Sequence, residues 1–442
     1  AQTVSQLTLG AGLSSISRDG GSTATINLNA ISGEGLTAGL ALSGDGIATT
    51  DQGNAPEGIL GGWATVSNNW AKNSTGGADG AIVGLTAGDY TDFVASGGDR
   101  DTNYSLTGST NVTGGYYLHT LRIANSADSD VLDIGNNSLN FSWNPLGGLL
   151  YAGGANNSYT ITGTGGLFQH NGNQPLLFTI YTGTLTVNCR FKSGGNHFAK
   201  NGAGTMVAGA DNNYSGTTYV NQGVFRLATD AGAGAAGGGI VVQPGAALEL
   251  TNSITVGAEA LTITGNGVSG GGVLRSRAGT NNYGGKISVR GYGARINSDS
   301  DTLTLTGDIL SAGKNVTFGG AGNITLSNTL VRAGSVTKDG TGKLGLVVTG
   351  SANQWLSGDM TLNESTLQFT FNEAPSESES VVKVLGDLIF DGTPTIEISA
   401  DPAGIAPSVR YPLLAVSGTA PSTAPQLQGV SGTLKWAGAG NK

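Results

Sequence analysis

The stretch 275–295 carries many basic side chains for a chain of 442 residues in which only 12% are charged. Its members are Arg275, Arg277, Lys286, Arg290 and Arg295. A polysaccharide lyase or hydrolase needs paired carboxylates, or a basic residue beside bound calcium. Alternation along a strand would put Arg275 and Arg277 on one face. The sequence favours a plainer interpretation, in which these cations form ion pairs with nearby Asp299 and Asp301.

Carboxylates also gather in three short clusters. The clusters are Asp99 with Asp101, then Asp128 with Asp130 and Asp133, and finally Asp299 with Asp301. Alternating carboxylates could bind calcium. The EF-hand order and the Gly-Gly-x-Gly-x-Asp nonapeptide are both missing from the sequence, however. We therefore expect solvated turns here, with no metal and no other cofactor.

The remaining reactive side chains are sparse. The three histidines, His119, His170 and His197, lie far apart and show no metal-binding spacing. We expect them to be solvated or hydrogen-bonded locally. The single cysteine, Cys189, excludes an internal disulfide and is expected to be a small buried apolar residue. The sequence therefore predicts no catalytic residue.

Tryptophan side chains could stack on sugar rings. The five are Trp63, Trp70, Trp143, Trp355 and Trp436. Trp63 and Trp70 lie in a turn-rich segment and are the preferred candidates for contact with a glycan. Trp355 falls at a repeated aromatic position and is expected in the core.

The elements that must position these residues are β-strands. Short runs alternate apolar and polar residues, as in ATINL at 24–28, TLTLT at 302–306 and TIEIS at 395–399. Gly accounts for 76 of the 442 residues. Gly and Asn separate the runs, at corners where positive φ is needed. Patterns with the helical period are nearly absent, so an all-β fold is predicted.

An internal repeat decides between a sandwich, a barrel and a solenoid. KNGAGT at 200–205 matches KDGTGK at 338–343, and VNQGVFRL at 220–227 matches LNESTLQF at 362–369. A unit of about 25–30 residues cannot bury its own apolar face, so copies must stack. We expect a right-handed parallel β-solenoid, whose coils pair with their neighbours at about 4.8 Å spacing.

The unit at 200–228 resembles the autotransporter-associated β-strand repeat. That family opens with Lys-x-Gly-x-Gly-Thr-Leu, continues with aromatic-Ser/Thr-Gly-Gly-Thr and closes with Asn-x-Gly-x-Leu. This chain reads KNGAGTM, YSGTT and NQGVFRL at the matching positions. The second copy departs from the pattern, with Ser365 in place of the closing Gly and an insertion before Trp355. The resemblance implies a parallel β-helix on the cell surface or outside the cell, and no particular reaction.

Three regions are expected along the chain. Residues 1–195 form a less regular β region, 196–400 the regular solenoid, and 401–442 a Pro-rich cap or extended arm. The chain begins with Ala, as signal-peptide removal would leave it, which predicts a secreted or surface location. Segments 58–92 and 381–418 also resemble large secreted bacterial proteins with this repeat. Their usual C-terminal barrel or sorting tail is missing from the sequence, so processing is expected rather than export through a barrel of its own.

The overall charge limits the classes of partner that the chain is expected to bind. A net charge of −9 argues against duplex nucleic acid, and no apolar run of 18 residues predicts a membrane span. The favoured function is structural: a secreted solenoid that assembles with copies of itself into a fibre or surface layer through terminal strands. The candidate assembly residues are Val4, Leu7, Leu9, Leu434 and Trp436. A glycan-binding adhesin with a polysaccharide partner is the alternative, and a polysaccharide-degrading enzyme is least favoured.

Overall fold

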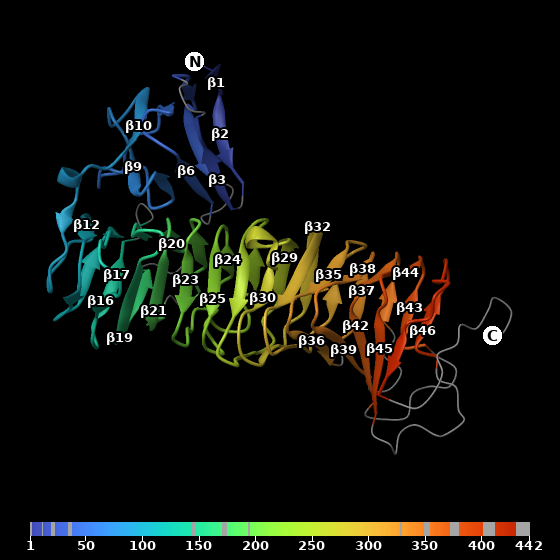
Figure 1. The fold of residues 1–442 in the computed structure, drawn as a ribbon. Coiled ribbons are helices and arrows are strands. Elements are labelled where there is room, and N and C mark those ends of the chain that lie inside the picture. The colour runs from blue at the N-terminus through green and yellow to red at the C-terminus, as the bar shows by residue number, and fades with distance from the viewer. Residues whose placement is uncertain are drawn as a thin grey trace. The chain divides into compact units, whose positions relative to one another are not determined.

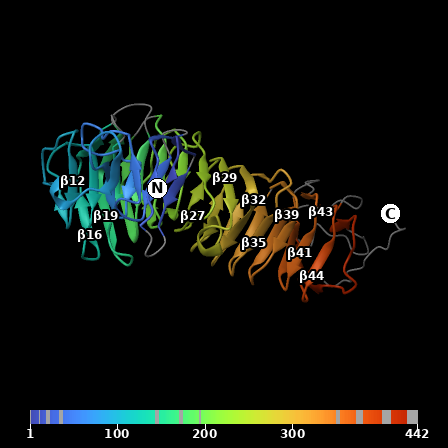
Figure 2. The same ribbon diagram turned by 90° about the horizontal axis from the view of Figure 1, so that it is seen from above.

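The computed structural model describes residues 2–10, 12–18, 23–33, 38–142, 147–169, 175–192, 195–327, 329–348, 354–371, 380–400 and 412–429. Over these residues the chain forms strands and two short 3₁₀ turns, η1 (Ala87–Asp89) and η2 (Val268–Gly270). The all-β prediction is therefore confirmed. Figures 1 and 2 show the stacked strands. The chain divides into two compact units, Ala1–Leu248 and Glu249–Lys442. The boundaries expected from the sequence at 195 and 400 remain predictions.

Unit 1 begins with a short stack of parallel strands. Three pairs form it, β1–β4, β2–β5 and β3–β6, and β7 and β8 extend it. An antiparallel path through β8, β9, β10 and β7 then ends the stack, which matches the expected irregularity of this region. The strands are β1 (Gln2–Thr3), β2 (Gln6–Leu9), β3 (Leu13–Ile16), β4 (Ile26–Asn27), β5 (Ala30–Gly33), β6 (Gly39–Leu42), β7 (Ala48–Thr50), β8 (Ala64–Val66), β9 (Asn69–Asn73) and β10 (Gly80–Gly84).

The rest of unit 1 is a parallel solenoid. One column of its core contains one buried apolar residue from each of five coils, namely Leu132, Ile161, Val187, Ala208 and Leu227. The strands from here to the second unit are β11 (Thr91–Asp92), β12 (Asn103–Leu106), β13 (Thr110–Asn111), β14 (Tyr116–Leu118), β15 (Thr120–Ile123), β16 (Asp130–Asp133), β17 (Ser138–Phe141), β18 (Gly148–Tyr151), β19 (Ser158–Gln169), β20 (Leu176–Ile180), β21 (Thr184–Phe191), β22 (Phe198–Asn201), β23 (Thr205–Ala208), β24 (Thr218–Val220), β25 (Val224–Leu227), β26 (Ile240–Val242) and β27 (Ala247–Leu250).

Unit 2 is built in the same way. Its core includes the column Leu303, Ile324, Leu344, Leu367 and Ile396. The strands are β28 (Thr255–Val256), β29 (Leu261–Gly265), β30 (Leu274–Ser276), β31 (Asn281–Tyr283), β32 (Ile287–Ser298), β33 (Thr302–Leu305), β34 (Ile309–Leu310), β35 (Val316–Gly319), β36 (Asn323–Ser327), β37 (Val331–Ala333), β38 (Val336–Lys338), β39 (Lys343–Val348), β40 (Gln354–Leu356), β41 (Met360–Asn363), β42 (Thr366–Phe371), β43 (Val382–Val384), β44 (Leu388–Asp391), β45 (Thr395–Ala400), β46 (Leu414–Val416) and β47 (Gln426–Gln428). The predicted parallel β-solenoid is therefore confirmed.

Aromatic rings fill part of the core of unit 1. Phe191 stacks on Phe198 with 5.1 Å between ring centroids. Phe178 meets both of these rings edge-on, at 5.4 and 5.7 Å, and Phe225 lies 5.5 Å from Phe198. Such ring pairs add to the free energy gained by burying their area. Neighbouring coils thus contribute bulky aromatic side chains that pack on one another in this core.

The lysine that opens each repeat copy lies in a core column. The backbone of Lys200 pairs with Phe178 in one neighbouring coil and with Val220 in the other. Its buried ammonium donates hydrogen bonds to the carbonyl oxygens of Gly204, at 2.5 Å, and Gln222, at 2.8 Å. The carbonyl of Gly204 also accepts the amide of Val224 at 3.2 Å, so the lysine adds a second donor there and supplies one to the carbonyl of Gln222.

Candidate functional site

A shallow groove crosses one face of unit 2. It follows β34, β37, β40 and β43, which lie side by side in parallel register. Leu310 pairs with Arg332, Arg332 with Trp355, and Trp355 with Lys383. Since the residues on either side of Arg332 are buried, the side chain of Arg332 faces outward. The groove therefore lies along the stack of coils rather than inside it.

A ladder of hydrogen bonds at the corner after these strands holds the groove in shape. The amide of Gly386 donates to the carbonyl of Gly358 at 3.1 Å, and the amide of Gly418 donates to that of Gly386 at 3.0 Å. The amide of Asp387 donates to Oδ1 of Asp359 at 2.8 Å. A Cβ at Gly386 would lie 2.3 Å from that same Oδ1. The corner therefore requires Gly at position 386. The hydrogen bonds and the lack of space for a side chain together fix the distance between neighbouring coils.

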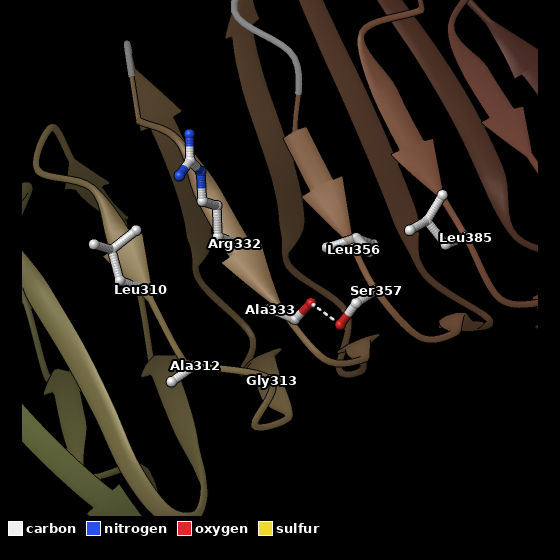
Figure 3. Close-up of a pocket in the computed structure, with 8 residues that line it drawn as sticks. All are labelled: Leu310, Ala312, Gly313, Arg332, Ala333, Leu356, Ser357 and Leu385. Atoms are coloured by element: carbon white, nitrogen blue, oxygen red, sulfur yellow. Dashed lines mark hydrogen bonds between the residues drawn. The ribbon is translucent and has the colours of Figure 1, made fainter.

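The groove has a volume of about 590 Å³ and is mainly apolar. Its lining residues are Leu310, Ala312, Gly313, Arg332, Ala333, Leu356, Ser357 and Leu385 (Figure 3). Leu385 keeps 49% of its surface exposed at one end. Ser357 Oγ donates to the carbonyl of Ala333 at 3.2 Å, as the dashed line in Figure 3 marks. The volume lies within the range of ligand-binding clefts.

Cations and carboxylates both lie around the groove. Arg332 is exposed at its side, and Lys314 is exposed next to the lining residue Gly313. The two nearest corner carboxylates, Asp359 and Asp387, each accept a backbone amide of the next coil. Asp308 precedes β34, and its Oδ1 accepts the amide of Leu330 at 3.0 Å. The open part of the groove thus presents a cation beside apolar surface.

The basic stretch 275–295 lies mostly outside this groove. Arg275 forms a two-pronged ion pair with Asp299, at 2.6 Å between Nη2 and Oδ2, so the predicted pairing is confirmed for these two residues. Asp301 instead accepts the amide of Gly279. Arg295 pairs with Asp339 at 2.7 Å, a partner from another coil that sequence reasoning missed. Two of the five basic side chains, Arg275 and Arg295, therefore form ion pairs within the fold.

The other predicted polar clusters are bonded locally. Oδ1 of Asp128 accepts the amide and the hydroxyl of Ser158. Asp133 accepts the amide of Gly135, and Asp99 that of Asp101. Within the described parts of the chain, no group of three or more His, Cys, Asp or Glu side chains is placed to hold a metal ion.

The histidines and the cysteine occupy different surroundings. Nδ1 of His197 accepts the amide of Thr217 at 2.9 Å, as expected for a locally bonded side chain. His119 differs, because it is fully buried and the burial lowers its pKa to about 4. His170 lies outside the described residues. Cys189 is buried, which raises its pKa to about 12 and agrees with the predicted apolar role.

The two tryptophans proposed for glycan contact lie against apolar cores. Trp70 is 0% exposed and packs with Ile59, Leu85 and Leu150, so its ring offers no face to a sugar. Trp63 is partly buried against the N-terminal core, and its role remains a prediction. Trp143 and Trp436 lie outside the described residues, as does the side chain of Trp355.

The predicted assembly residues are only partly described. Leu9 is buried, while Val4 and Leu7 pack partly buried against the N-terminal core. In the described structure β1 pairs with β4 and β2 with β5, each on one side. Leu434 and Trp436 fall outside the described residues. Assembly through these strands stays a prediction.

Comparison with known proteins supports the resemblance seen in the repeats. The chain is 26% identical over 433 aligned residues to the adhesin BmaC autotransporter of Brucella suis biovar 1 (strain 1330). The match covers 78% of this chain but 12% of that much longer relative. This likeness and the parallel solenoid together confirm the resemblance to an autotransporter passenger.

No family model matches the chain, and no solved structure matches it. In the described residues no helix is long and apolar enough to cross a membrane.

Proposed function

We propose that this chain is a non-enzymatic section of a bacterial surface adhesin, located outside the cell. The observation that carries the proposal is the open groove running across successive coils of unit 2. A parallel solenoid presents the same outward position at every coil, so it suits an elongated partner better than a compact one. The likeness to an autotransporter adhesin supports the same function.

Adhesion of coated particles tests this function. Fluorescent beads carrying the purified chain should adhere to epithelial cells more than beads carrying serum albumin do. Free chain added in excess should compete with the beads. Equal adhesion of both kinds of bead would overturn the proposal.

A second function, self-assembly into a fibre or surface layer, rests on the N-terminal strands. Strands β1 and β2 each pair on one side within the described structure, and an open strand edge is a template for another chain. Thr8→Pro removes one ladder amide from β2. Electron microscopy of a dilution series should show filaments for the unaltered chain and fewer for this variant. Single particles at every concentration would contradict assembly.

A further inference from the structure

We propose that the groove of unit 2 binds an acidic polysaccharide lying along the stack of coils, with an anionic group of the polymer on Arg332. This inference rests on the proposed adhesin function and adds the chemical class of the ligand. Three features of the groove support this inference: its direction along the coils, its charge, and the pairing of its strands on both sides.

The direction of the groove fits a chain-like ligand. The lining residues come from successive coils, from Leu310 in β34 to Leu385 just after β43. Coils repeat at about 4.8 Å, so four of them span roughly 14 Å. Figure 3 shows Leu310, Arg332, Leu356 and Leu385 on neighbouring strands along this path. A short run of sugar units would therefore contact several coils at once.

The charge of the groove selects an anion. The chain carries a net charge of −9, yet Arg332 is the one charged residue among the eight that line the groove. A guanidinium binds carboxylate or sulfate groups through two parallel hydrogen bonds. Attraction to the exposed Arg332 and the nearby exposed Lys314 would also direct anionic polymers to this groove.

The backbone of this face favours a glycan over a peptide. Peptides commonly bind sheets by adding a strand to an open edge. Strands β37, β40 and β43 are already paired on both sides, so no edge is open here. The ligand must contact side chains instead. Leu310, Ala312 and the half-exposed Leu385 offer apolar surface for the CH faces of sugar rings.

A bulge in β32 provides further contacts beside the column. Residues 290–293 lie opposite the single residue Thr264, because Ile263 pairs with Val289 and Gly265 with Ala294. The bulge begins two residues after Ser288, which pairs with Leu310 of the groove. Gly291 and Gly293 have φ of 56° and 108°, and Tyr292 between them is 97% exposed. Tyr offers a large amphipathic contact at low entropic cost.

Binding to defined polymers tests the inference. The immobilised chain is exposed to polygalacturonate, dextran sulfate, neutral dextran and poly-glutamate, and bound polymer is measured by interferometry. We expect binding of at least one anionic polysaccharide, weakened by salt. Arg332→Ala should weaken it by about tenfold or more. Leu385→Asp should weaken it similarly, and Tyr292→Ala by about threefold. Arg277→Ala, an exposed arginine outside the groove lining, is the matched control.

The possible results test the class of the ligand and the proposed adhesin function separately. Preference for polygalacturonate supports carboxylate groups, and preference for dextran sulfate supports sulfate groups. The inference is overturned if neither polymer binds, if poly-glutamate binds as tightly, or if Arg332→Ala and Arg277→Ala lose equal affinity. Circular dichroism confirms that each variant is folded. Cell adhesion without polysaccharide binding would remove the inference and keep the adhesin, whereas the reverse result would remove the adhesin.

Discussion

The two copies of the repeat place the same lysine in different surroundings. Lys200 in unit 1 is fully buried and donates to carbonyls of its own and the next coil, with its pKa held well below the usual value by burial. Lys338 in unit 2 is also buried but lies next to Asp339, which pairs with Arg295. Burial lowers the pKa of Lys338 to about 8. The motif therefore specifies a corner, while neighbouring coils specify its electrostatics.

The closing turns of the two copies differ as well. Gly223 closes the first copy with φ of 66°. Ser365 stands at the matching place in the second copy, and positive φ moves to the preceding residue, Glu364, at 39°. Ser365 is buried, and its hydroxyl donates to the carbonyl of Lys338 at 3.2 Å. The second copy thus carries its positive φ one residue earlier, on a residue that has a Cβ, and gains a side-chain hydrogen bond at Ser365.

The largest change in the free energy of unfolding is expected from a substitution at Lys200. Lys200→Met keeps the length of the side chain and removes the charged donor that the carbonyls of Gly202, Gly204 and Gln222 share. We expect the free energy of unfolding to fall by about 3 kcal/mol. Urea unfolding followed by circular dichroism measures the change. An unaltered midpoint would show that water or a shifted corner satisfies these carbonyls.

The second-largest loss of stability is expected from a substitution at Gly223. A Cβ here would lie 2.5 Å from the carbonyl oxygen of Gly204, and the residue has positive φ. Gly223→Ala should therefore lower the free energy of unfolding by about 2 kcal/mol. Ala203→Gly, in the opening turn of the same copy, is a control for general loosening of the chain. A loss no greater than that of the control would contradict the steric explanation.

A smaller effect is expected at Lys338, whose ammonium donates to the carbonyls of Asp339 and Gly340. Lys338→Met should lower the free energy of unfolding by about 1 to 2 kcal/mol, less than the change at Lys200. The same unfolding experiment compares them directly. If the two variants lose equally, the neighbouring charges do not distinguish the two corners.

The lowered pKa of Lys338 also predicts that the free energy of unfolding depends on pH. Burial lowers its pKa from 10.5 to about 8 in the folded chain. Between these values the unfolded chain binds the proton and the folded chain does not. The contribution of Lys338 to the free energy of unfolding therefore increases from pH 8 to pH 10.5. The difference between the unaltered chain and Lys338→Met, measured across that range, should rise with pH. A constant difference would contradict the lowered pKa.

The smallest effect is expected at Glu364, and it has the opposite sign. Glu364→Gly relieves the positive φ of a residue with Cβ. We expect the free energy of unfolding to rise by about 0.5 to 1 kcal/mol. Thermal unfolding measures the change, with Glu364→Ala as the control that removes the carboxylate but keeps Cβ. Stabilisation by both variants would point to the charge of Glu364 rather than to its backbone.

Much of the fold could be read from the sequence. The alternating runs and the paired KNGAGT and KDGTGK segments predicted a parallel solenoid, and the nearness of Arg275 to Asp299 predicted their ion pair. The buried role of the repeat lysine was missed, although its position in an apolar alternation was a signal. The burial of Trp70 was missed because its partners, such as Leu150, come from a distant coil.

The groove could not be predicted in the same way. Its residues are ordinary Leu, Ala, Gly and Ser around one Arg, and none of them is distinctive alone. A regular signal did exist in the corner pairs Gly334-Ser335, Gly358-Asp359, Gly386-Asp387 and Gly418-Thr419. Their recurrence could have located the corner that borders the groove, but not the residues that line it.

The sequence by itself determined the local geometry of this protein. Alternation sets which side chains of a strand face the core, and Gly sets where the coil turns. The tertiary structure alone decided which outward residues share a surface. Coils differ in length, so the register that joins Leu310 to Arg332, or Arg295 to Asp339, depends on how each coil packs on the next. Because packing fixes that register, a groove formed across coils appears only once they are stacked.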